Sequence, residues 1–137
     1  MTTLAADTPR TYEVGDIGEI PVIASDIIYE GSAVGDNASG YARPLVAADP
    51  FLGFAEQNVD NSAGAAGAKT VRVKERGKIV VPVTGVTGVG DIGTAVYMSD
   101  DNTFTLTSTS NSLVGKVVRH VSGTTVVVAF KSSALPD

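Results

Sequence analysis

Apolar and polar residues alternate along much of this chain with the two-residue period of a β-strand. The clearest alternation runs over residues 69–75, KTVRVKE, and over residues 103–107, TFTLT, where Phe104 and Leu106 should face the same side. No segment of the sequence keeps the 3.6-residue period of an amphipathic helix. The pattern therefore predicts a chain of many short strands.

Turn-forming residues divide the remaining apolar segments. Pro21 has no amide proton, so its strand should lie at a sheet edge or carry a bulge. Gly77 predicts a turn that pairs residues 69–75 with residues 78–83, and Ser122-Gly123 predicts a closing hairpin. The segment 58–68, NVDNSAGAAGA, predicts a long loop. Further strands are expected at residues 18–24, 26–29, 41–46, 51–56, 94–98, 114–121 and 124–130.

The composition agrees with this pattern. The chain contains 20 valines and 14 threonines, which favour extended backbone, and 15 glycines and 6 prolines, which supply turns. A length of 137 residues suits one domain with a sizeable core. We therefore predict an all-β fold, a small single-domain β-barrel or β-sandwich-like structure over residues 12–137. Residues 1–11 are polar and aperiodic and predict an extended, flexible N-terminal arm.

One short string occurs twice. VGDIG is found at residues 14–18 and again at residues 89–93. Two interpretations stay open at this point: duplication of half a barrel, or independent reuse of a Gly-Asp turn, which is the commoner origin of such a match.

The charge is unevenly distributed. The net charge is −5; residues 1–60 hold ten acidic and two basic side chains, a balance of −8, and residues 61–137 hold five acidic and eight basic ones, a balance of +3. Phosphate binding requires a basic face, so this balance disfavours nucleic acid as a partner. The asymmetry also allows one half of the chain to meet the other, within a subunit or between subunits.

Other classes are excluded by what the sequence lacks. There is no cysteine, which excludes disulfide scaffolds and thiolate metal sites. The start, MTTLAADTPR, does not resemble a secretory signal, and no apolar run approaches the roughly 20 residues of a membrane-spanning helix. We expect a soluble protein made in a cytoplasm, with no membrane partner.

Few residues could carry chemistry. His120 is the only histidine and lies in an alternating strand, so a structural role is expected for it. Asp100 and Asp101 are adjacent in a polar segment, which predicts a turn instead of an acid–base pair or a calcium loop. The glycine-rich segment 85–93 lacks the Lys-Ser/Thr pair of a phosphate loop. We therefore expect no enzyme activity, cofactor or metal.

A cluster of basic residues is the best candidate for a binding surface. Lys69, Arg72, Lys74, Arg76 and Lys78 make up half of all basic side chains. On one strand Arg72, Lys74 and Arg76 would share a face, while Lys78 would leave it if Gly77 begins a turn. The cluster is either a cationic stripe for an acidic partner or the charged, solvated face of an edge strand.

Several segments, taken in order, resemble bacteriophage capsid cement proteins, also called head decoration proteins. The resemblance covers residues 12–130. The segments are IIYEGSAVGD, GYARPL, DPFLGFA, DNSAGAAG, VRVKERGKIVVPVTG, VYMSDDNTFTLT and VGKVVRHVSGTTVVVAF.

The resemblance implies a structural virion protein. Proteins of this family are small and β-rich, form homo-oligomers that are often trimers, and bind the outside of an expanded head at junctions between capsomers. This chain would then contact the major capsid protein after synthesis in the bacterial cytoplasm. Family members commonly reach onto the shell with their N-terminal segments. Together with the basic cluster, the resemblance implies these candidates for capsid or subunit contacts: Thr2, Leu4, Pro9, Arg10, Tyr12, Arg72, Lys74, Arg76 and Lys78.

Two other functions have specific requirements that can be compared with the sequence. A carbohydrate- or receptor-binding β-domain on a virion surface would need exposed aromatic side chains, yet the chain has no tryptophan and is only 6% aromatic. An enzyme with an unfamiliar constellation would need a polar cleft around His120. The sequence therefore favours the capsid decoration hypothesis.

Overall fold

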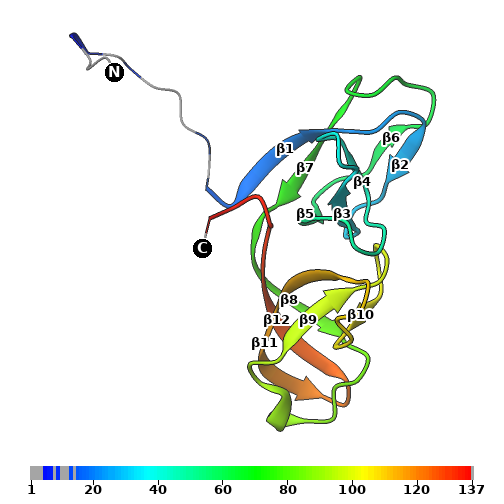
Figure 1. Ribbon diagram of the computed structural model, residues 1–137, viewed down its shortest axis with the longest axis vertical. Coiled ribbons are helices and arrows are strands. Elements are labelled where there is room, and N and C mark those ends of the chain that lie inside the picture. Colours follow the sequence, from blue (N-terminus) through cyan, green and yellow to red (C-terminus); the bar gives the residue numbers. More distant parts are fainter. Residues whose placement is uncertain (1–4, 8, 10–12, 14, 137) are drawn as a thin grey trace.

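The computed structural model describes residues 5–7, 9, 13 and 15–136. These residues form β-strands and one 3-10 helix (Figure 1), which confirms the all-β class. The elements are β1 Ile17–Pro21, β2 Asp26–Ile28, β3 Ala33–Asp36, β4 Ala42–Pro44, β5 Phe51–Ala55, β6 Val59–Asn61, β7 Thr70–Lys74, β8 Arg76–Pro82, η1 Val89–Asp91, β9 Ala95–Met98, β10 Phe104–Thr105, β11 Ser112–Ser122 and β12 Thr125–Lys131.

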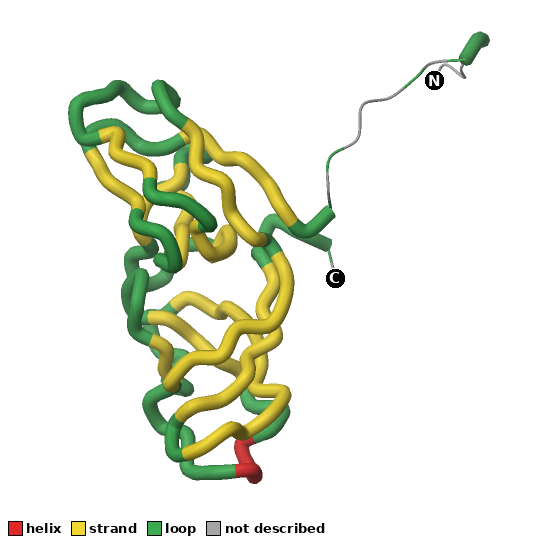
Figure 2. The backbone as a smooth tube through the Cα atoms, turned by 180° about the vertical axis from the view of Figure 1, so that it is seen from behind, coloured by secondary structure: helices red, strands yellow, loops and turns green. Residues whose placement is uncertain are grey.

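The strands form two five-stranded sheets and one small pair. The first sheet has the order β1-β7-β5-β3-β4, the second has the order β10-β9-β11-β12-β8, and β2 pairs with β6. The sheets lie one above the other along the long axis, as two lobes (Figure 1). We call residues 15–75 the first lobe and residues 76–136 the second lobe. The sheet of the second lobe curls into a half-barrel (Figure 2).

The two sheets have the same topology. Counted from the β8 edge, the second sheet has the order β8-β12-β11-β9-β10. Without β2 and β6, each lobe has five strands. In both sheets the first of these strands pairs with the fifth, the fifth with the fourth, the fourth with the second, and the second with the third. Every neighbouring pair is antiparallel in both sheets.

The pairing register repeats as well. Val34 faces Gly53 in the first sheet, and Val96 faces Gly115 in the second, which is 62 residues further along on both strands. In both ladders a one-residue bulge follows, at Leu52 in the first sheet and at Val114 in the second. The same 62-residue shift relates three further residue pairs of the first sheet to pairs of the second: Ala33–Phe54 to Ala95–Lys116, Gly35–Phe51 to Tyr97–Leu113, and Asp36–Ala42 to Met98–Phe104.

The lobes are therefore structural repeats, and the structure favours the duplication hypothesis. The VGDIG string, however, does not mark the repeat. Its first copy leads into β1, whereas its second copy leads into β9, the counterpart of β3. Pro21 and Pro82 mark it better, because they occupy matching ends of β1 and β8 and face Thr70 and Thr125.

The predicted hairpin between residues 69–75 and 78–83 is wrong. β7 pairs with β1 and β5, whereas β8 pairs only with β12, and a single residue, Glu75, separates them. The Glu75 amide donates to Asp16 in the first lobe, and its carbonyl accepts from Ser132 in the second. Gly77 lies inside β8 and not in a turn, because the chain passes directly from one sheet into the other.

Other predictions fared differently. The loop expected at residues 58–68 contains β6, which pairs with β2 because Asn61 ties the segment to the Ile23 and Ala65 carbonyls. The closing hairpin is confirmed as β11 and β12, and the strand of Pro21 lies at a sheet edge as expected. The N-terminal arm stays a prediction, because most of residues 1–11 lie outside the described part of the chain.

The hydrophobic core joins the lobes. One cluster of buried side chains fills the half-barrel and also includes Ala33, Leu45, Phe51 and Phe54 from the first lobe. A second cluster lies within the first lobe alone. At the junction the Phe54 ring packs edge-on to Phe51 and Phe130, at centroid distances of 5.2 and 4.8 Å. Such aromatic contacts add about 0.5–1.5 kcal/mol each beyond burial, so the joint is well suited to hold the lobes rigidly.

Candidate interaction surface

The predicted basic cluster is divided between the two lobes. Arg72 and Lys74 share the face of β7 opposite the buried Val71 and Val73, as expected from the alternation. Arg76 does not join them, because it begins β8 in the other sheet. It shares the exposed face of β8 with Lys78, so Lys78 leaves the face of Arg72 and Lys74 as expected but stays beside Arg76.

The first-lobe half of the cluster lies among acidic or accepting groups. The Lys74 ammonium is 3.7 Å from the Asp16 carboxylate. Lys69 donates to the Asp60 carbonyl oxygen, and Arg72 stands opposite Glu19 in the β1–β7 register. Local neighbours therefore offset much of this charge, and β7 is not an edge strand.

The second-lobe half lies beside further cations. In the β8–β12 register Arg76 stands opposite Lys131 and Lys78 opposite Ala129, which in turn faces Lys116 of β11. Cross-strand neighbours share a sheet face, so these cations gather on the outer face of the half-barrel. β8 is an edge strand, and its charges also protect it from pairing with other chains.

Four of the five candidates in the arm, Thr2, Leu4, Arg10 and Tyr12, lie outside the described residues. Pro9 is described and is exposed. Their proposed contacts stay predictions.

An apolar groove crosses the outer face of the half-barrel. It has a volume of about 610 Å³ and is lined by β9, β11, the end of β12 and the residues that follow. Leu113, 57% exposed, and Val118 are its open hydrophobic side chains. Lys116 and Lys131 line it too, and none of the described lining residues carries a carboxylate.

The alternation pattern did not predict this groove. The available signal was the alternation Ser112-Leu113-Val114, which places Leu113 on the face opposite the buried Val114. Nothing in the sequence alone indicated that the outward face would stay uncovered. A monomer tolerates single exposed apolar residues, but an apolar groove with a charged rim is typical of a protein-binding surface.

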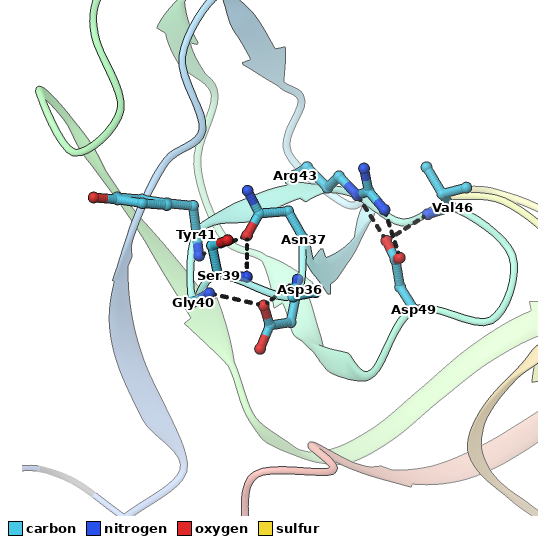
Figure 3. A network of polar contacts seen from close by, with 9 residues as sticks. Asp36, Asn37, Ser39, Gly40, Tyr41, Arg43, Val46 and Asp49 are labelled. Atoms are coloured by element: carbon cyan, nitrogen blue, oxygen red, sulfur yellow. Dashed lines mark hydrogen bonds and ion pairs between the residues drawn. The ribbon is translucent and has the colours of Figure 1, made fainter.

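The β3–β4 turn, residues 37–41, is held in one conformation by side chains. Asp36 Oδ1 accepts the amides of Ala38 and Gly40, and Asn37 Oδ1 accepts those of Ser39 and Tyr41 (Figure 3). These bonds stabilise Ala38 at a φ of 76°, a conformation that alanine rarely adopts. The tip of this turn is exposed and stiff, as a docking element needs to be.

The next loop is fixed by a bidentate ion pair. Arg43 donates from Nη2 to Asp49 Oδ1 at 2.7 Å and from Nε to Asp49 Oδ2 at 3.0 Å (Figure 3). Asp49 Oδ2 also accepts the Val46 amide. The hydrogen bond to Asp49 is the main reason why the pKa of Arg43 is raised. Both loops at this end of the first lobe are thus preorganised.

His120 and Asp91 both make local hydrogen bonds within turns. His120 Nε2 lies 3.0 Å from the Gly123 carbonyl oxygen and braces the closing turn. Asp91 accepts the amides of Thr87 and Gly88, and these bonds lower its pKa. Over the described ranges no group of three or more His, Asp or Glu side chains is placed to hold a metal ion. No helix in the described part is long and apolar enough to span a membrane.

No protein-family model matches the chain, and the search of curated proteins gave no significant match.

Proposed function

We propose that this chain is a capsid decoration protein. It binds the outer surface of an expanded phage head at junctions between capsomers, through contacts with the major capsid protein, and stabilises the shell against internal DNA pressure. Made in the bacterial cytoplasm, it ends on the outside of the virion as a homo-oligomer. The order of family-like segments over residues 12–130 is the starting point for this proposal.

The observation that best supports it is the joint between the lobes. The two lobes share one core cluster, and the aromatic rings of Phe51, Phe54 and Phe130 pack against one another at the junction. A rigid body of this kind loses little conformational entropy when it lies against another protein. Many copies on a symmetric shell then convert a modest affinity into firm attachment.

The polar groups support binding instead of catalysis. Asp60, Asp91 and Asp100 accept hydrogen bonds inside turns, where their role is to hold the backbone. The net charge of −5 also suits a protein that lies outside the shell and makes no contact with the genome inside it.

Co-sedimentation with purified heads tests the proposal. The full chain should pellet with expanded heads and stay in the supernatant with unexpanded ones. A chain without residues 1–11 should bind more weakly if the arm reaches the shell. Failure to bind expanded heads under any condition would refute the proposed function, whereas arm-independent binding would refute only the role of the arm.

A further inference from the structure

The repeat allows the groove to be compared, residue by residue, with a face of the first lobe. The register makes Leu113 the counterpart of Phe51 and Lys116 the counterpart of Phe54. Phe51 is 1% exposed, whereas Leu113 is 57% exposed. The same sheet face is therefore covered in the first lobe and open in the second.

The second lobe supplies the cover of the first. The Asp101 carbonyl in the β9–β10 turn accepts the Ala33 amide at 2.9 Å, and the neighbouring Asp100 pairs with Val46. The Phe54 ring lies 5.9 Å from that of Phe104, which follows this turn. Residues 99–104 of the second lobe thus contact Ala33, Val46 and Phe54 of the first lobe, while Phe51 packs against Phe130.

The counterpart of this docking element is uncovered. By the 62-residue shift, Asp100 and Asp101 correspond to Ala38 and Ser39 at the tip of the β3–β4 turn. Both tip residues are exposed, and Asp36 and Asn37 hold the turn rigid (Figure 3). The chain therefore presents one open groove and one open turn that match the two sides of its own internal contact.

Charge favours the same pairing. The first lobe, residues 15–75, carries nine carboxylates and four cations, a balance of −5, whereas the second, residues 76–136, carries three and five, a balance of +2. Lys116 and Lys131 line the groove. Opposite potentials attract a first lobe toward the groove and disfavour two second lobes meeting face to face.

We propose that the groove of the second lobe receives the β3–β4 turn from the first lobe of a second copy of this chain. The contact repeats the one between the lobes of a single chain, as in repeat proteins whose end faces match their internal faces. Because the two sides differ, the contact is head-to-tail and produces a closed ring or an open row.

Two single substitutions separate the two sides of the contact. Leu113→Asp places a carboxylate in the groove and leaves the turn intact. Ser39→Lys places a cation at the turn tip and leaves the groove intact. Each variant alone should sediment as a single chain of 14.0 kDa, whereas the unaltered chain should form larger species as its concentration rises.

Mixing the variants gives the decisive result. The turn of Leu113→Asp can still enter the groove of Ser39→Lys, so an equimolar mixture should form one-to-one pairs and nothing larger. An isologous contact, with the same patch on both sides, predicts no pair in this mixture. Absence of the pair, or association of either variant alone as strong as that of the unaltered chain, would overturn the proposal.

Matched controls guard against unfolding. Val80→Asp introduces the same negative charge as Leu113→Asp, at a residue that is 60% exposed on β8 and does not line the groove. Ser122→Lys introduces the same positive charge as Ser39→Lys, at the exposed end of the β11–β12 hairpin. Both control variants should associate like the unaltered chain; equal loss of association in them would count against a specific contact.

The experiment also separates the groove from capsid binding. It uses no phage head, so failure to self-associate would leave the decoration hypothesis to its own co-sedimentation test. If the unaltered chain stays single and Leu113→Asp instead weakens binding to heads, the groove belongs to the shell protein and the head-to-tail proposal is refuted.

Discussion

At the scale of single residues, two adjacent carboxylates have opposite environments. Asp100 accepts the amides of Asn102 and Thr103 and the Thr103 hydroxyl, and the first of these bonds is the main cause of its lowered pKa. Asp101 has a raised pKa, mainly because burial disfavours its charge and also because Asp100 repels it. The sequence predicted a turn here but not this difference, which depends on the first lobe covering one of the pair.

We expect Asp100→Asn and Asp101→Asn to change stability in opposite directions. The lowered pKa of Asp100 means that its stabilisation is complete above the unfolded value of 3.8 and is lost as the pH falls through the folded pKa. Asp100→Asn should therefore be less stable at neutral pH, with a deficit that shrinks in acid.

The sign reverses for its neighbour. Ionised Asp101 is disfavoured in the folded state, and this penalty disappears as the pH falls from the folded pKa to 3.8. Asp101→Asn should be more stable than the unaltered chain at neutral pH, with a gain that fades in acid. Urea denaturation midpoints from neutral pH to pH 3 measure both effects. Parallel pH profiles for the two variants would contradict the assignment.

At the scale of the strand pairs, the repeated bulge depends on two matching glycines. A Cβ atom at Gly53 would overlap the Lys74 carbonyl, and one at Gly115 would overlap the Ala129 carbonyl. In both lobes the bulge lets one apolar residue, Leu52 or Val114, turn into a core cluster. Leu113 beside Val114 faces outward, whereas Phe51 beside Leu52 is buried in the cluster that the lobes share. The glycine allows the next strand to approach closely at that point.

Gly115→Ala should destabilise the protein by about 1–3 kcal/mol, because either β11 or β12 must move to make room for the new methyl group. Gly90→Ala is the matched control: its Cβ meets nothing within 4 Å, so its effect should stay within about 0.5 kcal/mol. Chemical denaturation measures both free energies of unfolding. Equal effects would show that the close approach is not tight.

Element types were predictable from local pattern, whereas strand partners were not. Alternation located β7, β9, β11 and β12, because side-chain direction in a strand is a local property. The wrong hairpin at Gly77 arose because a glycine between two strands permits either a turn or a direct crossing between sheets. The direct crossing is favoured by the hydrophobic cluster that the two lobes share, and the local sequence does not reveal that cluster. The positions that correspond between the two lobes were equally hidden, since they share register and glycines but little continuous sequence.

At the scale of the whole molecule, stability depends on whether the lobes unfold together. Phe54 comes from the first lobe and contacts Phe104 and Phe130 of the second. Phe54→Ala should cost about 3–5 kcal/mol, the usual loss for a buried ring. Amide hydrogen exchange should then rise in both sheets together. Phe54→Leu, which keeps most of the volume, should cost less, and faster exchange confined to the first sheet would contradict a shared core.

The divided basic cluster leads to a prediction about binding to the head. Lys78 belongs to the cationic outer face of the half-barrel, whereas Arg72 stands opposite Glu19. If the proposed function is correct, Lys78→Glu should slow association with expanded heads by about tenfold and reduce its salt dependence, because exposed charges act mainly on the rate of encounter. Arg72→Glu makes the same charge change where neighbours already offset the charge, so association should change by less than about twofold. Association rates measured by light scattering over a salt series distinguish the two variants. Equal slowing would mean that the head recognises the net charge of the molecule and not the half-barrel face.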